Sequence, residues 1–195
     1  CSFGTIGTTS FFPAKPLGCY GDGGAIFTDN EEFAHLADSY RVHGKGSYKY
    51  DNVRIGLNSR LDTIQAAILL VKLNAFKKYE LEAVNKVAGW YNDRLCKIVE
   101  TPFIPDGYKS SWAQYTIKLP TQSDRDELQA KLRSSGIPSM VYYPIPMHKQ
   151  SAFSGLHTSE EEICPVATSL SQRVLSLPMH PYMTKEDVDF ISSVR

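Results

Sequence analysis

The chain has 195 residues, of which 42% are hydrophobic and 22% charged, enough for one large domain or two small ones. Its 21 basic and 21 acidic residues balance, so no net charge favours nucleic acid or an anionic membrane surface as a partner. No apolar run approaches the length of a membrane span, and the four cysteines have neither metal-ligand spacing nor the density of a disulfide scaffold. The cysteine spacing therefore indicates no metal site, and we expect the protein in the reducing cytoplasm.

The first elements expected are a strand and a helix. The chain starts at Cys1 without an initiator methionine, and we expect an N-terminal portion to precede it. Residues 23–28 predict a short buried strand. Residues 29–32 offer a polar turn and an acidic first helical turn, and apolar residues then recur at helical spacing as far as His43. A loop rich in Gly, Lys and Tyr follows, to about residue 55.

The rest of the chain predicts a long helix and then a mixed second part. The helix should start near Asp62 and run, with a bend near Lys77, to about Ile98. The best division of the chain is therefore into residues 1–76 and 77–195. The later elements expected are a strand, a helix, a strand and two helices, at residues 113–119, 124–134, 139–143, 165–174 and from 184.

Lys15 is the most conspicuous candidate for chemistry. It lies between Pro13 and Pro16, which disfavour a regular helix through this segment. Apolar neighbours on both sides would suppress the charge of its amine, as a lysine nucleophile requires. Hydroxyl residues at 8–10 are potential donors to a phosphate, and the spacing is not that of a Walker A loop. From these residues alone, a covalent role and an ordinary loop lysine both remain open.

The segment SFFPAKPLGCYGDGG at residues 10–24 resembles the cofactor-lysine motif of the DegT/DnrJ/StrS sugar-nucleotide aminotransferases, which use pyridoxal 5'-phosphate (PLP). The resemblance continues in family order through LNSRLDTIQAA at 57–67, YYPIPMH at 142–148 and LPMHPY at 177–182. It implies an α/β fold class: the C-terminal part of a fold type I PLP-dependent transferase large domain, followed by a smaller α+β domain.

The resemblance also implies roles for the residues that would bind the cofactor. Lys15 would form the Schiff base with PLP and move a proton between substrate and cofactor. Ser10 would bind the PLP phosphate, and Asn58 would reach the same phosphate from a neighbouring subunit, which implies a homodimer. The acidic residue that pairs with the PLP ring nitrogen in the family lies upstream of the lysine motif, so Asp22 does not match it. We therefore expect this chain by itself to have little activity.

Four further residues match positions near the substrate in similar enzymes. Arg60 matches a substrate-side arginine, and Tyr142, Tyr143 and His148 match a segment near the sugar. Tyr142 departs from the histidine expected there. Taken without the resemblance, Arg60 reads as a solvated charge, the two tyrosines as strand residues, and His148 as a structural histidine.

The sequence is most similar to transaminases that aminate a UDP-linked 3-keto N-acetyl hexuronic acid during surface-polysaccharide or lipopolysaccharide synthesis, with glutamate as the amino donor. Two alternatives stay open. One is an aminotransferase for another nucleotide-linked keto sugar, and the other is a non-catalytic binding or regulatory protein built on the same fold.

Overall fold

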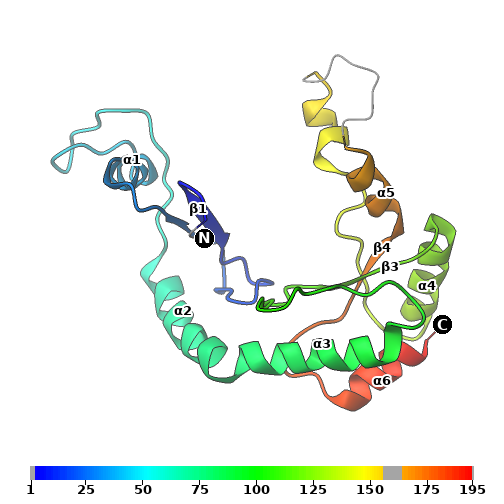
Figure 1. Ribbon diagram of the computed structural model, residues 1–195. Helices are drawn as coiled ribbons and strands as arrows, with labels where there is room; N and C mark the ends of the chain where they lie inside the picture. Colours follow the sequence, from blue (N-terminus) through cyan, green and yellow to red (C-terminus); the bar gives the residue numbers. More distant parts are fainter. Residues whose placement is uncertain (1–2, 156–163, 195) are drawn as a thin grey trace. The chain divides into compact units, whose positions relative to one another are not determined.

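The computed structural model describes residues 3–155 and 164–194 (Figure 1). The chain divides into two compact units, an N-terminal unit of residues 1–78 and a C-terminal unit of residues 79–195. Among the described residues, no helix has both the length and the apolar character needed to cross a membrane.

A two-stranded antiparallel sheet opens the N-terminal unit. Strand β1 (Gly7–Ser10) pairs with β2 (Gly24–Phe27), so that Ser10 lies opposite Gly24 at one end and Gly7 opposite Phe27 at the other. Sequence reasoning missed β1, and the expected burial of the strand at 23–28 is wrong. Side chains of β2 are largely exposed, with 59% of Ile26 and 46% of Phe27 accessible. The strand is apolar, but no second layer of the described chain covers it.

Two helices follow β2. Helix α1 (Glu31–Arg41) begins at Asn30, whose side-chain oxygen accepts a hydrogen bond of 3.0 Å from the Phe33 N–H, as expected of an N-cap. Helix α2 (Thr63–Ala75) is apolar on most of its circumference, yet only its Leu69 is buried. An apolar surface of this kind is typical of a helix that packs against further protein.

The long helix expected from residue 62 to residue 98 is interrupted. A π-helical turn, η1 (Phe76–Glu80), follows α2, and helix α3 continues from Leu81 to Leu95. The interruption falls where we expected a bend, near Lys77. Extra residues in a helical turn displace the hydrogen-bond ladder, and such turns recur at functional sites and hinges.

The C-terminal unit contains a second antiparallel pair, in which β3 (Tyr115–Lys118) lies beside β4 (Val174–Leu177). Its remaining elements are α4 (Gln122–Ser134), the short 3-10 turns η2 (Met147–Lys149) and η3 (Ser151–Phe153), α5 (Pro165–Arg173) and α6 (Lys185–Ser193). The strand expected at residues 139–143 is wrong, because only Met140 forms a bridge, with Ser176. The strand that pairs with β3 is β4, which we had not expected.

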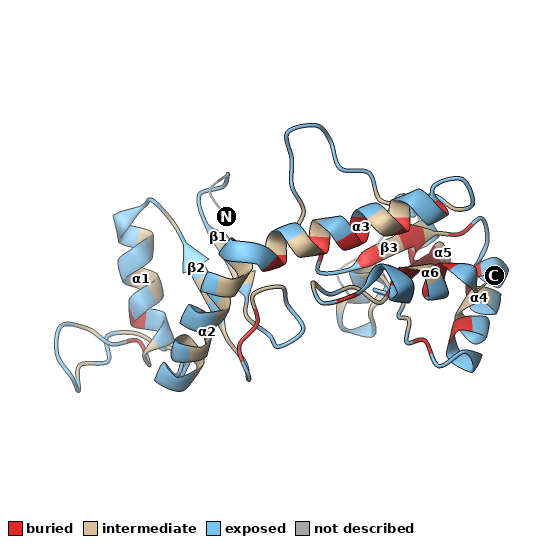
Figure 2. Ribbon diagram, turned by 90° about the horizontal axis from the view of Figure 1, so that it is seen from below, coloured by how far each residue is buried: buried red, intermediate tan, exposed pale blue. Residues whose placement is uncertain are grey.

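The core of the described chain lies in the C-terminal unit, between α3, the β3–β4 pair and the helices α4 and α6 (Figure 2). The Tyr91 and Tyr115 rings stack with their centroids 4.7 Å apart, and the Tyr91 hydroxyl donates to the Pro178 carbonyl at 2.8 Å. Burial raises the pKa of both tyrosines, so they stay neutral. The most deeply buried members are Tyr91, Tyr115, Ile117, Leu132, Leu175, Val87 and Val188.

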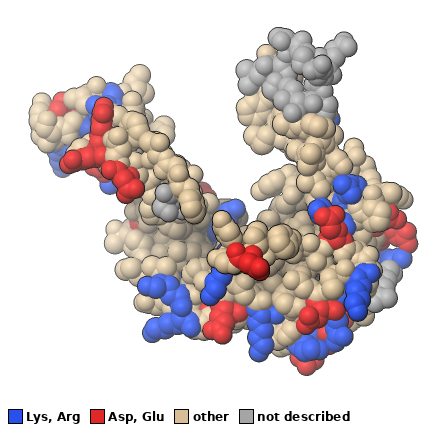
Figure 3. Space-filling model, in the orientation of Figure 1, with Lys and Arg blue, Asp and Glu red and all other residues tan. Residues whose placement is uncertain are grey.

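Acidic and basic side chains are interspersed over the face of the described residues drawn in Figure 3. One cluster joins two helices of the C-terminal unit. The Arg94 guanidinium on α3 donates to both carboxylate oxygens of Asp189 on α6, at 2.7 and 2.8 Å, and Lys185 adds a third contact at 2.8 Å. These donors hold the pKa of Asp189 well below its usual range.

This cluster predicts a pH effect on stability. The Asp189 pKa is lower in the folded chain than in the unfolded chain. The Asp189 carboxylate therefore makes its full contribution to the free energy of unfolding above about pH 4, and this contribution is lost as the pH falls further. Asp189→Asn should therefore lower the free energy of unfolding at neutral pH, with a difference from wild type that shrinks under acid conditions. Urea unfolding across the pH range measures this, with Asp106→Asn as the exposed control. A difference independent of pH would contradict the assignment.

Candidate functional site

The loop between β1 and β2, residues 11–23, carries Lys15 and is closed at its base by hydrogen bonds. The Phe11 N–H donates to the Gly23 carbonyl at 2.8 Å, and the Cys19 N–H donates to the Phe11 carbonyl at 2.8 Å. The Cys19 thiol is fully buried, with its sulfur 3.0 Å from the carbonyl oxygens of both Phe11 and Gly21. The ends of the loop are therefore fixed to each other beside the Ser10–Gly24 end of the sheet.

Lys15 itself lies in a tight turn at the far side of this loop. Its N–H donates to the Phe12 carbonyl at 2.8 Å, and its side chain is exposed. Among the residues described, its amine has no hydrogen bond or ion pair. Ser10, at the end of β1, accepts a 3.2 Å hydrogen bond from the Phe12 N–H through its Oγ, which leaves the hydroxyl proton to donate elsewhere.

The turn around Lys15 depends on close backbone contact at Gly18. A Cβ atom at this position would lie 2.7 Å from the carbonyl oxygens of both Phe12 and Pro13. Both neighbours are backbone atoms of the lysine turn, so any side chain at residue 18 would have to displace that turn. The glycine is thus a requirement of the loop geometry.

Asn58 and Arg60 lie on a segment attached to the end of α1. The Leu57 N–H donates to the Tyr40 carbonyl at 2.7 Å, and the Ser59 N–H donates to the Arg41 carbonyl at 2.9 Å. The Arg60 guanidinium donates to the Asn58 side-chain oxygen at 2.7 Å. This bond occupies the acceptor end of the Asn58 amide and leaves its N–H groups directed to a different acceptor.

The structure brings this segment against the lysine loop. The Tyr20 N–H donates to Oε1 of Gln65, in the first turn of α2, at 2.8 Å. Leu61 approaches the other end of the loop, with its Cδ1 3.0 Å from where a Cβ on Gly23 would lie. The motifs at 10–24 and 57–67, separate in sequence, therefore form one assembly. Sequence reasoning gave Gln65 no role; its polar character in a mostly apolar helix was the available signal.

The other predicted site residues lie in the C-terminal unit. The exposed rings of Tyr142 and Tyr143 meet edge to face, with centroids 5.5 Å apart. His148 is half-buried, and its Nε2 lies 3.3 Å from the Thr168 hydroxyl. These contacts leave the tyrosine pair accessible and tie the histidine to α5. Their roles toward a substrate remain predictions.

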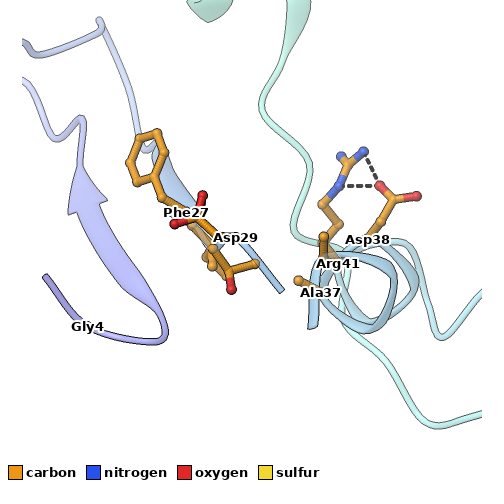
Figure 4. A pocket seen from close by; sticks show the side chains of 9 residues that line it. Gly4, Phe27, Asp29, Ala37, Asp38 and Arg41 are labelled. Atoms are coloured by element: carbon orange, nitrogen blue, oxygen red, sulfur yellow. Dashed lines mark hydrogen bonds and ion pairs between the residues drawn. The ribbon is translucent and has the colours of Figure 1, made fainter. Parts of the chain in front are cut away.

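A cavity of about 670 Å³ lies elsewhere in the N-terminal unit, between β2 and α1 (Figure 4). Phe27 and Asp29 line one wall, and Ala37, Asp38 and Arg41 of α1 line the other. The Arg41 and Asp38 side chains pair with each other at 2.6 Å across one turn of α1. The cavity borders the Phe27 end of the sheet, opposite the end at which Ser10 leads into the lysine loop. It is therefore separate from the predicted cofactor residues.

Within the described chain, no group of three or more His, Cys, Asp or Glu side chains is arranged to hold a metal ion.

Three curated relatives resemble the chain over nearly its whole length. The first is UDP-2-acetamido-2-deoxy-3-oxo-D-glucuronate aminotransferase of Pseudomonas aeruginosa, 44% identical over 98% of this chain and 51% of its own length. The second is a pleiotropic regulatory protein of Geobacillus stearothermophilus, 42% identical over 96% of this chain and 50% of its own. The third is UDP-N-acetyl-3-dehydro-alpha-D-glucosamine 3-aminotransferase of Acidithiobacillus ferrooxidans, 40% identical over 99% and 50%. The chain thus spans about half the length of these relatives.

Solved structures also match this chain over about half of their own length. A DegT/DnrJ/EryC1/StrS aminotransferase from Brucella abortus superposes with a TM-score of 0.91 at 51% identity, over 98% of this chain and 50% of its own. NtdA from Bacillus subtilis, solved with bound cofactor PMP, superposes with a TM-score of 0.83 at 28% identity, over 98% and 46%. The predicted α/β fold class is confirmed. The sequence model of the family matches residues 1–194, and the chain belongs to the DegT/DnrJ/EryC1/StrS aminotransferase family.

Proposed function

We propose that the whole protein is a PLP-dependent aminotransferase that moves an amino group from glutamate to the 3-keto group of a UDP-linked N-acetyl hexuronic acid. The main support is the environment of Lys15. Its amine is exposed and has no partner among the described residues, and the ends of its loop are fixed by backbone and thiol contacts. Two relatives named for amination of UDP-linked 3-oxo sugars support the substrate class. We place the protein in the cytoplasm and its reaction in surface-polysaccharide synthesis, both of which are consistent with a UDP-linked sugar as substrate.

The residues present fit PLP by the chemistry of their donors. PLP has an aldehyde, which an amine attacks, and a phosphate, which hydroxyl and amide N–H groups bind. Lys15 supplies the amine, while the Ser10 hydroxyl keeps its proton to donate. The Asn58 amide has its acceptor occupied by Arg60 and its donors left over, as a phosphate ligand requires. We assign Asn58 to the phosphate of a neighbouring subunit, and so propose a homodimer.

When bound, PLP supplies the electron sink that allows a proton to leave carbon. The reaction then needs a base that holds this proton and returns it. We assign that role to Lys15 Nζ, which would take a proton from the α-carbon of glutamate and deliver one to C3 of the keto sugar. The turn that carries Lys15 limits how far Nζ moves between the two positions.

Recognition of the two substrates falls to residues outside the lysine loop. The planar guanidinium of Arg60 suits a carboxylate or a phosphate, both of which the substrates contain. Tyr142, Tyr143 and His148 provide aromatic faces and polar groups for the sugar. Glutamate and a hexuronic acid each carry a carboxylate. One arginine would therefore bind the first substrate in one half-reaction and the second in the other.

Assay of the whole protein with PLP, glutamate and a panel of keto-sugar nucleotides tests the substrate. We expect the largest kcat/KM for the UDP-linked 3-keto hexuronic acid, with one 2-oxoglutarate formed per amino sugar. A larger value for another nucleotide-linked keto sugar would overturn the substrate assignment. PLP binding without turnover of any panel member would instead favour a regulatory role, as the name of the Geobacillus relative suggests.

A further inference from the structure

The side chain of Gln65 makes a hydrogen bond to the lysine loop and not to its own helix, α2. It lies in the first turn of a helix whose other side chains are mostly apolar, and it is half-buried. Its Oε1 accepts the Tyr20 N–H at 2.8 Å. Its Nε2 lies 3.1 Å from where a Cβ on Gly21 would be, so the amide packs closely against this part of the chain.

The hydrogen bond between Tyr20 and Gln65 lies next to the base of the lysine loop. Tyr20 and Gly21 directly follow Cys19, whose N–H and thiol close the base of the lysine loop. A hydrogen bond at Tyr20 therefore ties this closed loop to α2. The same helix follows the Asn58–Arg60 segment after only two residues. The Gln65 side chain thus joins the lysine loop to the helix that follows Asn58 and Arg60, and the Lys72 amine of the same helix lies 5.8 Å from the centre of the Tyr20 ring.

We propose that Gln65 is a positioning residue, which holds the lysine loop against α2 in the arrangement that Lys15 needs to bind PLP. The inference rests on the proposed function of Lys15. Gln65 acts through Tyr20 and does not touch the reacting atoms. Loss of its acceptor oxygen would free the Tyr20 N–H and loosen the loop, while the closed base of the loop, formed by Phe11 and Cys19, would remain.

Four variants of the whole protein separate this role from a general effect on folding. Gln65→Ala removes the acceptor and raises helix propensity, so any loosening cannot come from a weaker helix. Gln65→Leu keeps the bulk without the acceptor, and Gln65→Glu keeps an acceptor oxygen. Asn74→Ala removes an exposed amide from the same helix and is the matched control.

The first measurement is amide hydrogen exchange of the peptide that contains Tyr20, in the cofactor-free protein. Loss of one hydrogen bond should speed exchange of this amide by about five-fold in Gln65→Ala and Gln65→Leu. Gln65→Glu and Asn74→Ala should exchange as wild type does. Unchanged exchange in both Gln65→Ala and Gln65→Leu would overturn the proposed contact.

The second measurement is the rate at which PLP dissociates, followed by its visible absorbance. We expect faster dissociation from Gln65→Ala and Gln65→Leu, and wild-type dissociation from Gln65→Glu and Asn74→Ala. Faster exchange with unchanged PLP dissociation would overturn the positioning role. A Lys15→Ala protein that still holds PLP covalently would instead refute the proposed function and leave the exchange result standing, so the two failures are distinguishable.

Discussion

Lys15→Ala should lower the transamination rate of the whole protein by about 10²- to 10⁴-fold, the range typical of losing a positioned acid–base group. The amine has no hydrogen-bond or ion-pair partner among the described residues, so its removal leaves no buried group unpaired. Stability should therefore stay close to that of wild type while turnover collapses. The visible band of lysine-bound PLP should disappear as well. Steady-state kinetics and an absorbance spectrum provide both results.

The matched control is Lys109→Ala, which removes another exposed loop lysine, in the C-terminal unit. It should leave both the rate and the spectrum unchanged. A Lys15→Ala protein that keeps a wild-type rate would show that a different amine performs the chemistry.

Gly18→Ala should have the second largest effect, through the geometry of the same turn. A Cβ at this position would lie 2.7 Å from the carbonyl oxygens of Phe12 and Pro13, and neither backbone atom can move without moving the turn that carries Lys15. A misplacement of about 1 Å at a reacting group can cost on the order of 100-fold in rate, and we expect a loss of about that size. The measurements are kcat and the rate of PLP incorporation.

Gly89→Ala is the control for this substitution, because a Cβ at Gly89 in α3 would meet no atom within 4 Å. Here alanine should raise the free energy of unfolding by about 0.5–1 kcal/mol, since glycine is the poorer helix former. As a control, Gly89→Ala should leave kcat unchanged, whereas Gly18→Ala should lower it. Equal rates in Gly18→Ala and Gly89→Ala would contradict the close contact at residue 18.

Helices of this chain were predictable from local sequence because their signals are local. The Asn30 cap and the acidic turn after it mark the start of α1, and the structure confirms that helix. The helix expected from Thr184 is confirmed as α6, where Thr184 and Asp187 form a reciprocal capping box. These interactions span three residues, so they are visible in the sequence itself.

The strands were predicted less well, since a strand is defined by its partner. The run at 139–143 has strand-like residues, yet prolines at 144 and 146 follow, and only Met140 pairs. Strand β4 pairs with β3 although it directly follows helix α5, and no turn residue in the sequence separates the two elements. Such pairing depends on packing of distant residues, which a short pattern does not specify.

The same contrast between local and distant signals applies to the residues of the candidate site. Lys15 and Ser10 could be proposed from a contiguous motif, because a lysine between prolines after a run of hydroxyls is unusual in itself. Gln65 was missed because its contact with Tyr20 joins residues 45 apart in the chain. The cofactor and substrate roles of the predicted site residues come from resemblance and stay predictions: Lys15, Ser10, Asn58, Arg60, Tyr142, Tyr143 and His148.

The most direct test of the account is to identify the lysine that binds PLP. The whole protein is loaded with PLP and reduced with borohydride, which makes a Schiff-base linkage permanent, and its peptides are then examined by mass spectrometry. We predict a pyridoxyl phosphate group on Lys15 and on no other lysine of the chain. A label confined to a different lysine, or full PLP binding with Lys15 unlabelled, would contradict it.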